Sequence, residues 1–348
     1  MLPLPDMTDL TDTPDAADTG PDDDTWDALH ARAYAAFDQG ELHTASALFG
    51  ELAQHAPEVP FLHYMRGLAH KYLRDWPASL QHNLRAQSLS AEPDQGTAWN
   101  AGIAATALGD WAQARSQWAQ CGITLPDGDG PIEHDFGIIS VRLNPWAEGE
   151  TVFARRIDVV RARLLNVPLP ESGHRLFDIV LHDGAKTGVR ALDDGTVPVF
   201  NALQILQRSD HRTYVAFIRC PSADDLDQLQ QAELPGIGYV EDWTASIVSL
   251  CLRCSYGVAH AQDDGDSDGA HDQGAASNDD WQVERNLGIG AQGKAAVERL
   301  LTNWVAAGPG RRVDAIECPA CEERAPQDGT VWWRGPGDDD AQGDDEEA

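Results

Sequence analysis

The chain has 348 residues, enough for two or three domains, and 25 Lys and Arg against 57 Asp and Glu give it a net charge of −32. Such a balance disfavours binding to nucleic acid or an anionic membrane, because both need a positive surface. No stretch approaches the roughly 20 apolar residues that span a bilayer, and the N-terminus lacks the pattern of a signal peptide, so we expect a cytoplasmic protein.

Many of the acidic side chains lie in three segments that contain no Lys or Arg. Residues 1–24, 261–280 and 338–348 together carry 22 acidic side chains. Chains of this composition bury too little apolar surface to offset the entropy lost on ordering. We therefore expect disordered acidic tails at 1–24 and 323–348, and a disordered insertion at 258–280.

A motif recurs three times in the first third of the chain, at a spacing of 34 to 35 residues. Each copy has a turn residue, a small residue five positions later and a larger residue four positions after that. A fixed period in this range predicts stacked helix–turn–helix units. In order, the three copies are Gly40, Ala45 and Phe49; Arg74, Ser79 and Asn83; and Gly109, Ala114 and Trp118.

The pattern resembles the tetratricopeptide repeat family over roughly residues 26–126, with Gly67 and Gly102 at the small position of the first helix. Arg74 in place of the turn glycine and Asn83 in place of an aromatic residue depart from it. The resemblance implies an α solenoid of three helix–turn–helix repeats, which we place at residues 25–130, and a protein or peptide partner.

The geometry of that family also implies a concave face lined by the first helix of each repeat. Aromatic side chains dominate interface hot spots, so an aromatic groove is suited to a peptide or helix with apolar anchors. No polar capping helix follows Pro126, so two alternatives stay open: a free groove, or a groove filled by the next domain. The predicted groove residues are Tyr34, Phe37, Tyr64, Lys71, Tyr72 and Trp99.

Short β-branched or alternating runs separated by turn residues fill 131–210 and predict a small antiparallel β-barrel or curled sheet. Its turns contain Ser172, His174, His182 and Asp183. Such residues could form the Ser–His–Asp triad of a hydrolase-type enzyme, but no nucleophile-elbow motif accompanies them. Turn chemistry is the preferred interpretation, and we expect no enzymatic activity.

From 211 to 322 the order of predicted elements is strand–helix–strand, an insertion, then strand–helix–strand. This βαββαβ order is typical of a ferredoxin-like α+β domain, here with an acidic insertion. The fold serves many functions and predicts none of them.

The insertion and the chain beyond the last strand contain two C-x-x-C pairs. We expect Cys251, Cys254, His260 and His271 to form one structural zinc site, because two cysteines at this spacing and downstream histidines can complete a tetrahedral shell. The alternatives are a site made with Cys318 and Cys321, free thiols, or reversible disulfides. The interval of 63 residues between the two pairs is longer than usual. Topology also suggests that the pairs lie at opposite ends of the sheet, roughly 20 Å apart.

The sequence thus favours a non-enzymatic adaptor or scaffold that binds a protein or peptide through residues 25–130, with a regulatory or docking C-terminal half. The alternative is a metal- or small-molecule-responsive sensor built on the ferredoxin-like domain. The sequence predicts no cofactor other than zinc, and it does not determine the oligomeric state.

Overall fold

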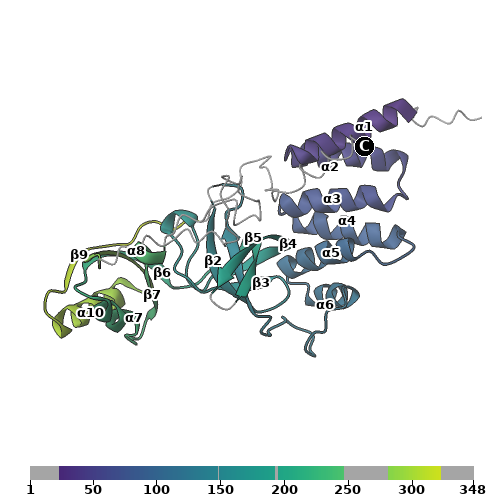
Figure 1. Ribbon diagram of the computed structural model, residues 1–348. Coiled ribbons are helices and arrows are strands. Elements are labelled where there is room, and N and C mark those ends of the chain that lie inside the picture. The colour runs from purple at the N-terminus through teal and green to yellow at the C-terminus, as the bar shows by residue number, and fades with distance from the viewer. Residues whose placement is uncertain (1–22, 148, 193–194, 247–280, 323–348) are drawn as a thin grey trace, which may run out of the picture.

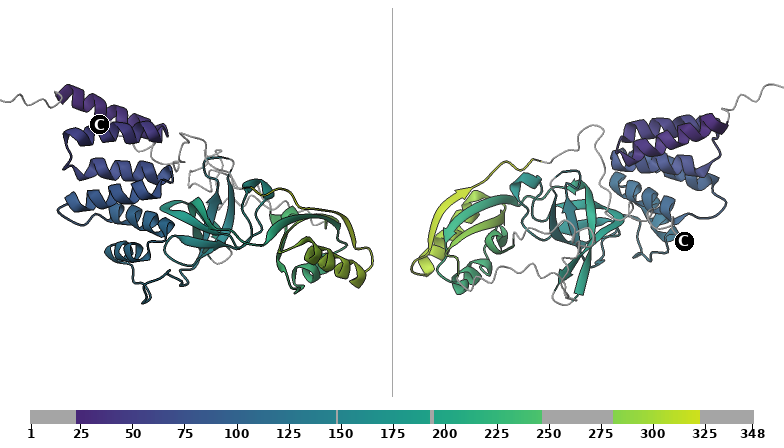
Figure 2. Two further views of the ribbon diagram at one scale, coloured as in Figure 1. Left: turned by 180° about the vertical axis from the view of Figure 1, so that it is seen from behind. Right: turned by 45° about the horizontal axis from the view of Figure 1, so that its top comes forward.

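The computed structural model describes residues 23–147, 149–192, 195–246 and 281–322, which form three bodies in a row (Figure 1, Figure 2). A stack of helices comes first in the chain, a small barrel lies at the centre, and a four-stranded sheet with helices lies at the far end. The segments predicted to be disordered fall outside the described residues, except that the first helix begins at Asp23.

Six helices follow one another in three helix–turn–helix pairs, which confirms the predicted solenoid. Each pair turns at a residue with left-handed backbone: φ is +76° at Gly40, +58° at Arg74 and +70° at Gly109. Arg74 therefore adopts the backbone conformation that glycine adopts most readily. The helices are α1 (Asp23–Asp38), α2 (Leu42–His55), α3 (Pro60–Tyr72), α4 (Trp76–Leu89), α5 (Gln95–Leu108) and α6 (Trp111–Gln120).

The small residues of the motif let the two helices of a pair approach closely. A Cβ on Gly102 would lie 2.6 Å from the Trp118 ring, and one on Gly67 would lie 2.5 Å from Nδ2 of Asn83. Asn83 is fully buried, and its amide donates to the carbonyl of Ser79 at 2.8 Å. The unusual Asn83 thus fills the aromatic position with its Nδ2 bonded inside its own helix, while its Oδ1 is buried without a hydrogen-bond partner among the described residues.

Five strands close a barrel in chain order. Each strand pairs antiparallel with the next, whereas β1 and β5 pair parallel, with Ser140 opposite Val199. The prediction of an antiparallel barrel is wrong for this pair, because a meander of five strands leaves its first and last strands running in the same direction. The strands are β1 (Ile138–Leu143), β2 (Glu150–Arg156), β3 (Arg161–Leu164), β4 (Ile179–Leu192) and β5 (Gly195–Gln207), and a short 3-10 helix, η1, covers Pro170–Ser172.

A large bulge interrupts β4 in the middle of the barrel. His182 is opposite Ala202 and Lys186 is opposite Phe200, so three residues of β4 face the single residue Asn201. Extra residues in one strand leave the ladder and redirect their side chains. Asp183 and Gly184 lie in this bulge, on the side of the helical repeats.

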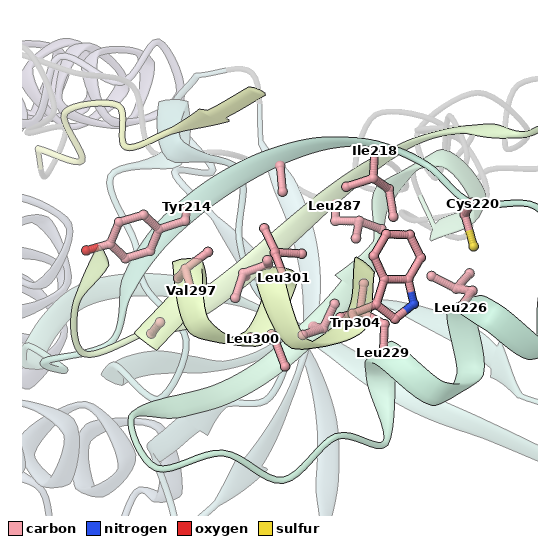
Figure 3. Packing of buried hydrophobic residues seen from close by; sticks show 14 residues of the cluster. Tyr214, Ile218, Cys220, Leu226, Leu229, Leu287, Val297, Leu300, Leu301 and Trp304 are labelled. Atoms are coloured by element: carbon pink, nitrogen blue, oxygen red, sulfur yellow. The ribbon is translucent and has the colours of Figure 1, made fainter. Parts of the chain in front are cut away.

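The third body is a four-stranded antiparallel sheet in the order β7-β8-β6-β9. Figure 3 shows its core, in which Trp304 and Leu301 of α10 and Leu229 of α7 pack against Leu287 and Ile218 of the sheet. The elements are β6 (Arg212–Arg219), α7 (Ala223–Gln230), β7 (Ile237–Asp242), α8 (Trp243–Ser246), β8 (Glu284–Ala291), α10 (Lys294–Ala307) and β9 (Arg312–Glu317).

Apolar side chains also join the three bodies. Ile103 and Trp118 of the last repeat share one buried cluster with Val160 and Leu181 of the barrel, so the barrel covers the end of the solenoid. On the other side, Leu176 and Trp243 cover the second face of the sheet, where glycines leave room: a Cβ on Gly290 would lie 2.4 Å from Leu176 and one on Gly288 2.3 Å from Trp243.

Candidate functional site on the first helices of the repeats

The predicted groove residues all lie on α1, α3 and α5, the first helix of each repeat. The structure gives them three different environments: the core of the first repeat, the contact with the barrel, and a partly exposed surface. Phe37 is 5% exposed and belongs to the core of the first repeat.

Lys71 lies in the contact with the barrel. Its Nζ donates to both carboxylate oxygens of Asp183, at 2.9 and 3.2 Å, and the two side chains are 4% and 5% exposed. The same Nζ lies 4.3 Å from the ring centre of Tyr72. Burial raises the pKa of Asp183, but Lys71 and the N–H groups of Ala185 and Gly184 outweigh it and lower that pKa below its usual value. Lys71 is therefore already bound to an anion of its own chain.

Trp99 lies against the same bulge. A Cβ on Gly184 would fall 1.6 Å from Nε1 of Trp99, so only glycine fits there. The Trp99 ring also packs edge-on against Trp118, with centroids 5.3 Å apart. Nearby, Nε1 of Trp76 donates to Oε1 of Gln204 at 2.6 Å. The barrel thus occupies the α3–α5 part of the predicted groove face. The filled-groove alternative therefore holds for this part of the face.

The α1–α3 part of the face carries a surface that we call the aromatic patch, made of His30, Tyr34, Phe61 and Tyr64. Phe61 is 38% exposed, and its ring stacks on Tyr34 with centroids 6.0 Å apart and planes at 17°. His30 and Tyr64 flank the pair, at 6.5 and 6.4 Å from the Phe61 ring. Rings in this arrangement offer a partner apolar surface that is already ordered.

The rim of the aromatic patch is acidic. Burial, followed by the charge of Asp38, raises the pKa of Tyr34. Burial, followed by the charge of Asp94, raises the pKa of Tyr64. Both carboxylates therefore lie close enough to the tyrosines to act on them.

The serine and histidine side chains of the possible hydrolase triad contact backbone carbonyl groups. Ser172 Oγ donates to the carbonyl of Leu169, and Nδ1 of His174 lies 2.9 Å from the carbonyl oxygen of Ser172. Nδ1 of His182 lies 2.7 Å from the carbonyl oxygen of Asp183. Burial lowers the pKa of both histidines to about 4. Among the described atoms, these side chains do not form a Ser–His–Asp relay.

The predicted zinc ligands Cys251, Cys254, His260 and His271 lie outside the described residues. Within the described part of the chain, no three His, Cys, Asp or Glu residues are grouped to hold a metal ion. Cys318 is exposed, and Cys321 is half-buried and donates to the carbonyl of His174 at 3.1 Å.

The premise of the topological argument against a joint site, that β7 and β9 end at opposite ends of the sheet, is wrong, whereas the separation of the two C-x-x-C pairs stays a prediction because Cys251 and Cys254 lie outside the described residues. Asp242, Leu287, Ala216 and Ile316 are consecutive partners across the four strands, so β7 and β9 end in neighbouring rows. Both strands stop at the same level although they run in opposite directions. Three strand spacings, roughly 14 Å, separate these ends instead of a full strand length.

Sequence reasoning did not select Phe61 or His30 for the groove, nor Asp183 and Gly184 for the contact with α3 and α5. Phe61 precedes Tyr64 by three residues on α3, and His30 precedes Tyr34 by four on α1. Residues three and four apart share one face of a helix, so this spacing was the available signal.

No protein family and no curated protein matches the chain. Solved structures that match include the first tetratricopeptide repeat domain of Spaghetti (RPAP3) bound to the HSP90 peptide SRMEEVD, at 18% identity and a TM-score of 0.27, over 30% of this chain and 81% of that one. Another is the TPR2B domain of yeast Sti1 in its complex with pHsp70, at 16% identity and a TM-score of 0.26, over 28% of this chain and 76% of that one. No helix in the described residues is long and apolar enough to cross a membrane.

Proposed function

We propose that this chain is a protein-interaction adaptor that binds a peptide or helix on the aromatic patch. The observation that carries the proposal is the stack of Tyr34 and Phe61, partly exposed beside Tyr64 on the α1–α3 part of the face. The acidic rim favours a ligand with an apolar anchor next to Lys or Arg. The barrel holds the other end of the face, which fixes the orientation of the repeats on the C-terminal half.

Affinity capture from a native lysate tests this function with the full-length chain. We expect a partner that the unaltered protein retains and that the double variant Phe61→Ala, Tyr64→Ala binds at least tenfold more weakly, because few aromatic anchors carry most of an interface's binding energy. Phe217→Ala is the matched control: Phe217 is similarly exposed, at 37%, but lies on β6 of the distal sheet. A partner held equally by all three proteins would move the binding site elsewhere.

For the C-terminal half we propose a ferredoxin-like unit that serves as a docking or regulatory module. Two observations support this assignment: the element order β6-α7-β7-β8-α10-β9 around the short α8, and the strand order β7-β8-β6-β9. The barrel covers the sheet face opposite α7 and α10, so the module is attached through both Leu176 and Trp243.

A sensor is the second candidate. A cleft of about 760 Å³ beside β7, lined by residues 230–235 and 237–240, favours its small-molecule version. For the metal version, elemental analysis of freshly purified protein should find near one zinc per chain, and Cys251→Ser should lose it. Matched loss of zinc in Cys318→Ser would indicate a joint four-cysteine site, and protein without zinc would eliminate the metal version.

A further inference from the structure

A cluster of basic and imidazole side chains lies on the side of α3 turned away from the aromatic patch. His63, Arg66 and His70 follow at intervals of three and four residues on α3, nearly opposite the positions of Phe61 and Tyr64 on the helix. His82 of α4 stacks between the two histidines, with ring centroids 6.1 Å from His63 and 5.6 Å from His70. We call these four residues the His–Arg cluster.

Arg66 is the unusual member of the cluster. Its guanidinium lies against α2, 3.4 Å from where a Cβ on Gly50 would be. Its Nε is buried and makes no hydrogen bond, and no ion pair to Arg66 is present among the described residues, in a chain with a net charge of −32. A half-buried cation without a counterion is costly, and an anion supplied from outside would remove that cost.

The other charged and titratable groups around the cluster come from α2 and α4. His43 of α2 acts on His70 through its charge, and Ser46 of α2 lies 3.0 Å from Nε2 of His70. The carboxylate of Asp75 lies 3.2 Å from Nδ1 of His70. The cluster gains positive charge whenever its histidines take up protons.

The geometry does not suit a metal ion. The imidazole planes are stacked, at 24° and 20° to one another, so ring faces meet where a metal would need converging nitrogens. Nε2 of His63 is also engaged with the carbonyl of Pro57, at 3.1 Å. No grouping of metal-binding side chains occurs in the described residues, this cluster included.

We propose that the His–Arg cluster between α2, α3 and α4 is a binding site for a phosphate group. Arg66 supplies the permanent charge and the planar pair of donors that matches phosphate oxygens. His82 and His70 become donors when the bound dianion makes their protonated forms favourable. Without the anion, burial and then the charges of Arg66, His70 and His63 lower the pKa of His82 to about 4, and burial lowers that of His70. Binding should therefore take up protons.

Titration of the imidazole resonances of histidine-labelled full-length protein tests this site, with H82Q to assign the His82 signal. Inorganic phosphate should raise the pKa of His82 by at least one unit, and sodium chloride at equal ionic strength should not. Sulfate keeps its charge between pH 5.5 and 7.5, and we expect it to bind more tightly at pH 5.5 than at pH 7.5, because a higher bound-state pKa of His82 couples binding to proton uptake. An unchanged His82 pKa in phosphate would overturn the proposal.

Variants locate the site and identify the source of the phosphate. Arg66→Gln should weaken phosphate binding at least tenfold, while Arg85→Gln should change it less than twofold, because Arg85 is exposed on α4 and donates to Oγ of Ser88. Arg66→Lys, which keeps the charge, serves if the glutamine variant does not fold. Tighter binding of a phosphoserine peptide than of inorganic phosphate would indicate a phosphorylated partner, and the reverse would indicate free phosphate. Equal binding by Arg66→Gln and the unaltered protein would refute the site.

Discussion

Lys71→Met should destabilise the protein by about 3–5 kcal/mol, because it leaves the carboxylate of Asp183 buried without a counterion. The two side chains are 4% and 5% exposed, so water cannot replace the lost partner. The loss should appear in urea unfolding followed by circular dichroism. Faster hydrogen exchange around residues 182–186 should accompany it, since the bulge would no longer be held against α3.

A double-mutant cycle separates the ion pair from other effects of the substitutions. Asp183→Asn keeps an oxygen for the N–H groups of Gly184 and Ala185, which now donate to Asp183 Oδ1 at 2.7 and 3.4 Å. The double variant Lys71→Met, Asp183→Asn should therefore lose much less stability than the sum of the single variants. Arg155→Gln breaks the exposed pair with Asp135 and should cost under about 1 kcal/mol. Strict additivity in the cycle would mean that the Lys71–Asp183 pair holds nothing together.

The repeats could be predicted from the sequence because their determinants are local and periodic. Gly67 and Gly102 recur with the large residues they face, and the turns at Gly40 and Gly109 show the same period. The strands of the barrel were also accessible: β1 to β5 all lie within the segment 131–210 that was predicted to be rich in strands. Alternation and turn residues act over a few positions, so they survive in the sequence as a pattern.

The contact between repeats and barrel could not be predicted, because its partners are far apart in the chain. Lys71 and Asp183 are separated by 112 positions. His182-Asp183-Gly184 has the composition of a turn, and it was interpreted as one, yet β4 continues through it to Leu192. Two contacts with distant residues stabilise the bulge: Asp183 pairs with Lys71, and Gly184 leaves room for Trp99. Neither contact can be recognised from the residues that neighbour the bulge in the sequence. For the same reason, Lys71 and Trp99 were assigned to a partner's groove.

The register of the strands was a second property that could not be predicted from the sequence. The order of elements in residues 211–322 correctly gave four strands, but not where each strand ends against its neighbour. The row that joins Asp242 to Ile316 depends on the offset of β7 along β8, which side-chain packing sets. The expectation that β7 and β9 end at opposite ends of the sheet failed at this point.

Glu150→Gln should stabilise the protein increasingly as the pH rises from 4.5 to 8. Glu150 begins β2 and is partly buried, with the N–H of Leu169 as its donor, at 3.2 and 3.1 Å from the two carboxylate oxygens. Burial, followed by the negative charges of Glu241 and Glu171, raises its pKa to about 8, although the hydrogen bond from the backbone N–H of Leu169 acts in the opposite direction. The folded chain therefore keeps a proton that the unfolded chain releases above pH 4.5.

Because the folded state binds more protons in this window, Glu150 lowers the free energy of unfolding as the pH rises, by about 1.4 kcal/mol for each pH unit. Glutamine has no proton to release, and its oxygen can still accept from Leu169. The gain of the variant over the unaltered protein should thus be near zero at pH 4.5 and about 4 kcal/mol at pH 8. Urea unfolding at pH 5, 6.5 and 8 measures the difference directly.

Glu133→Gln, at an exposed position of the same body, should give a small change that is the same at all three pH values. A gain for Glu150→Gln that did not grow with pH would show that Glu150 is ionised in the folded protein, with a counterion that compensates its burial.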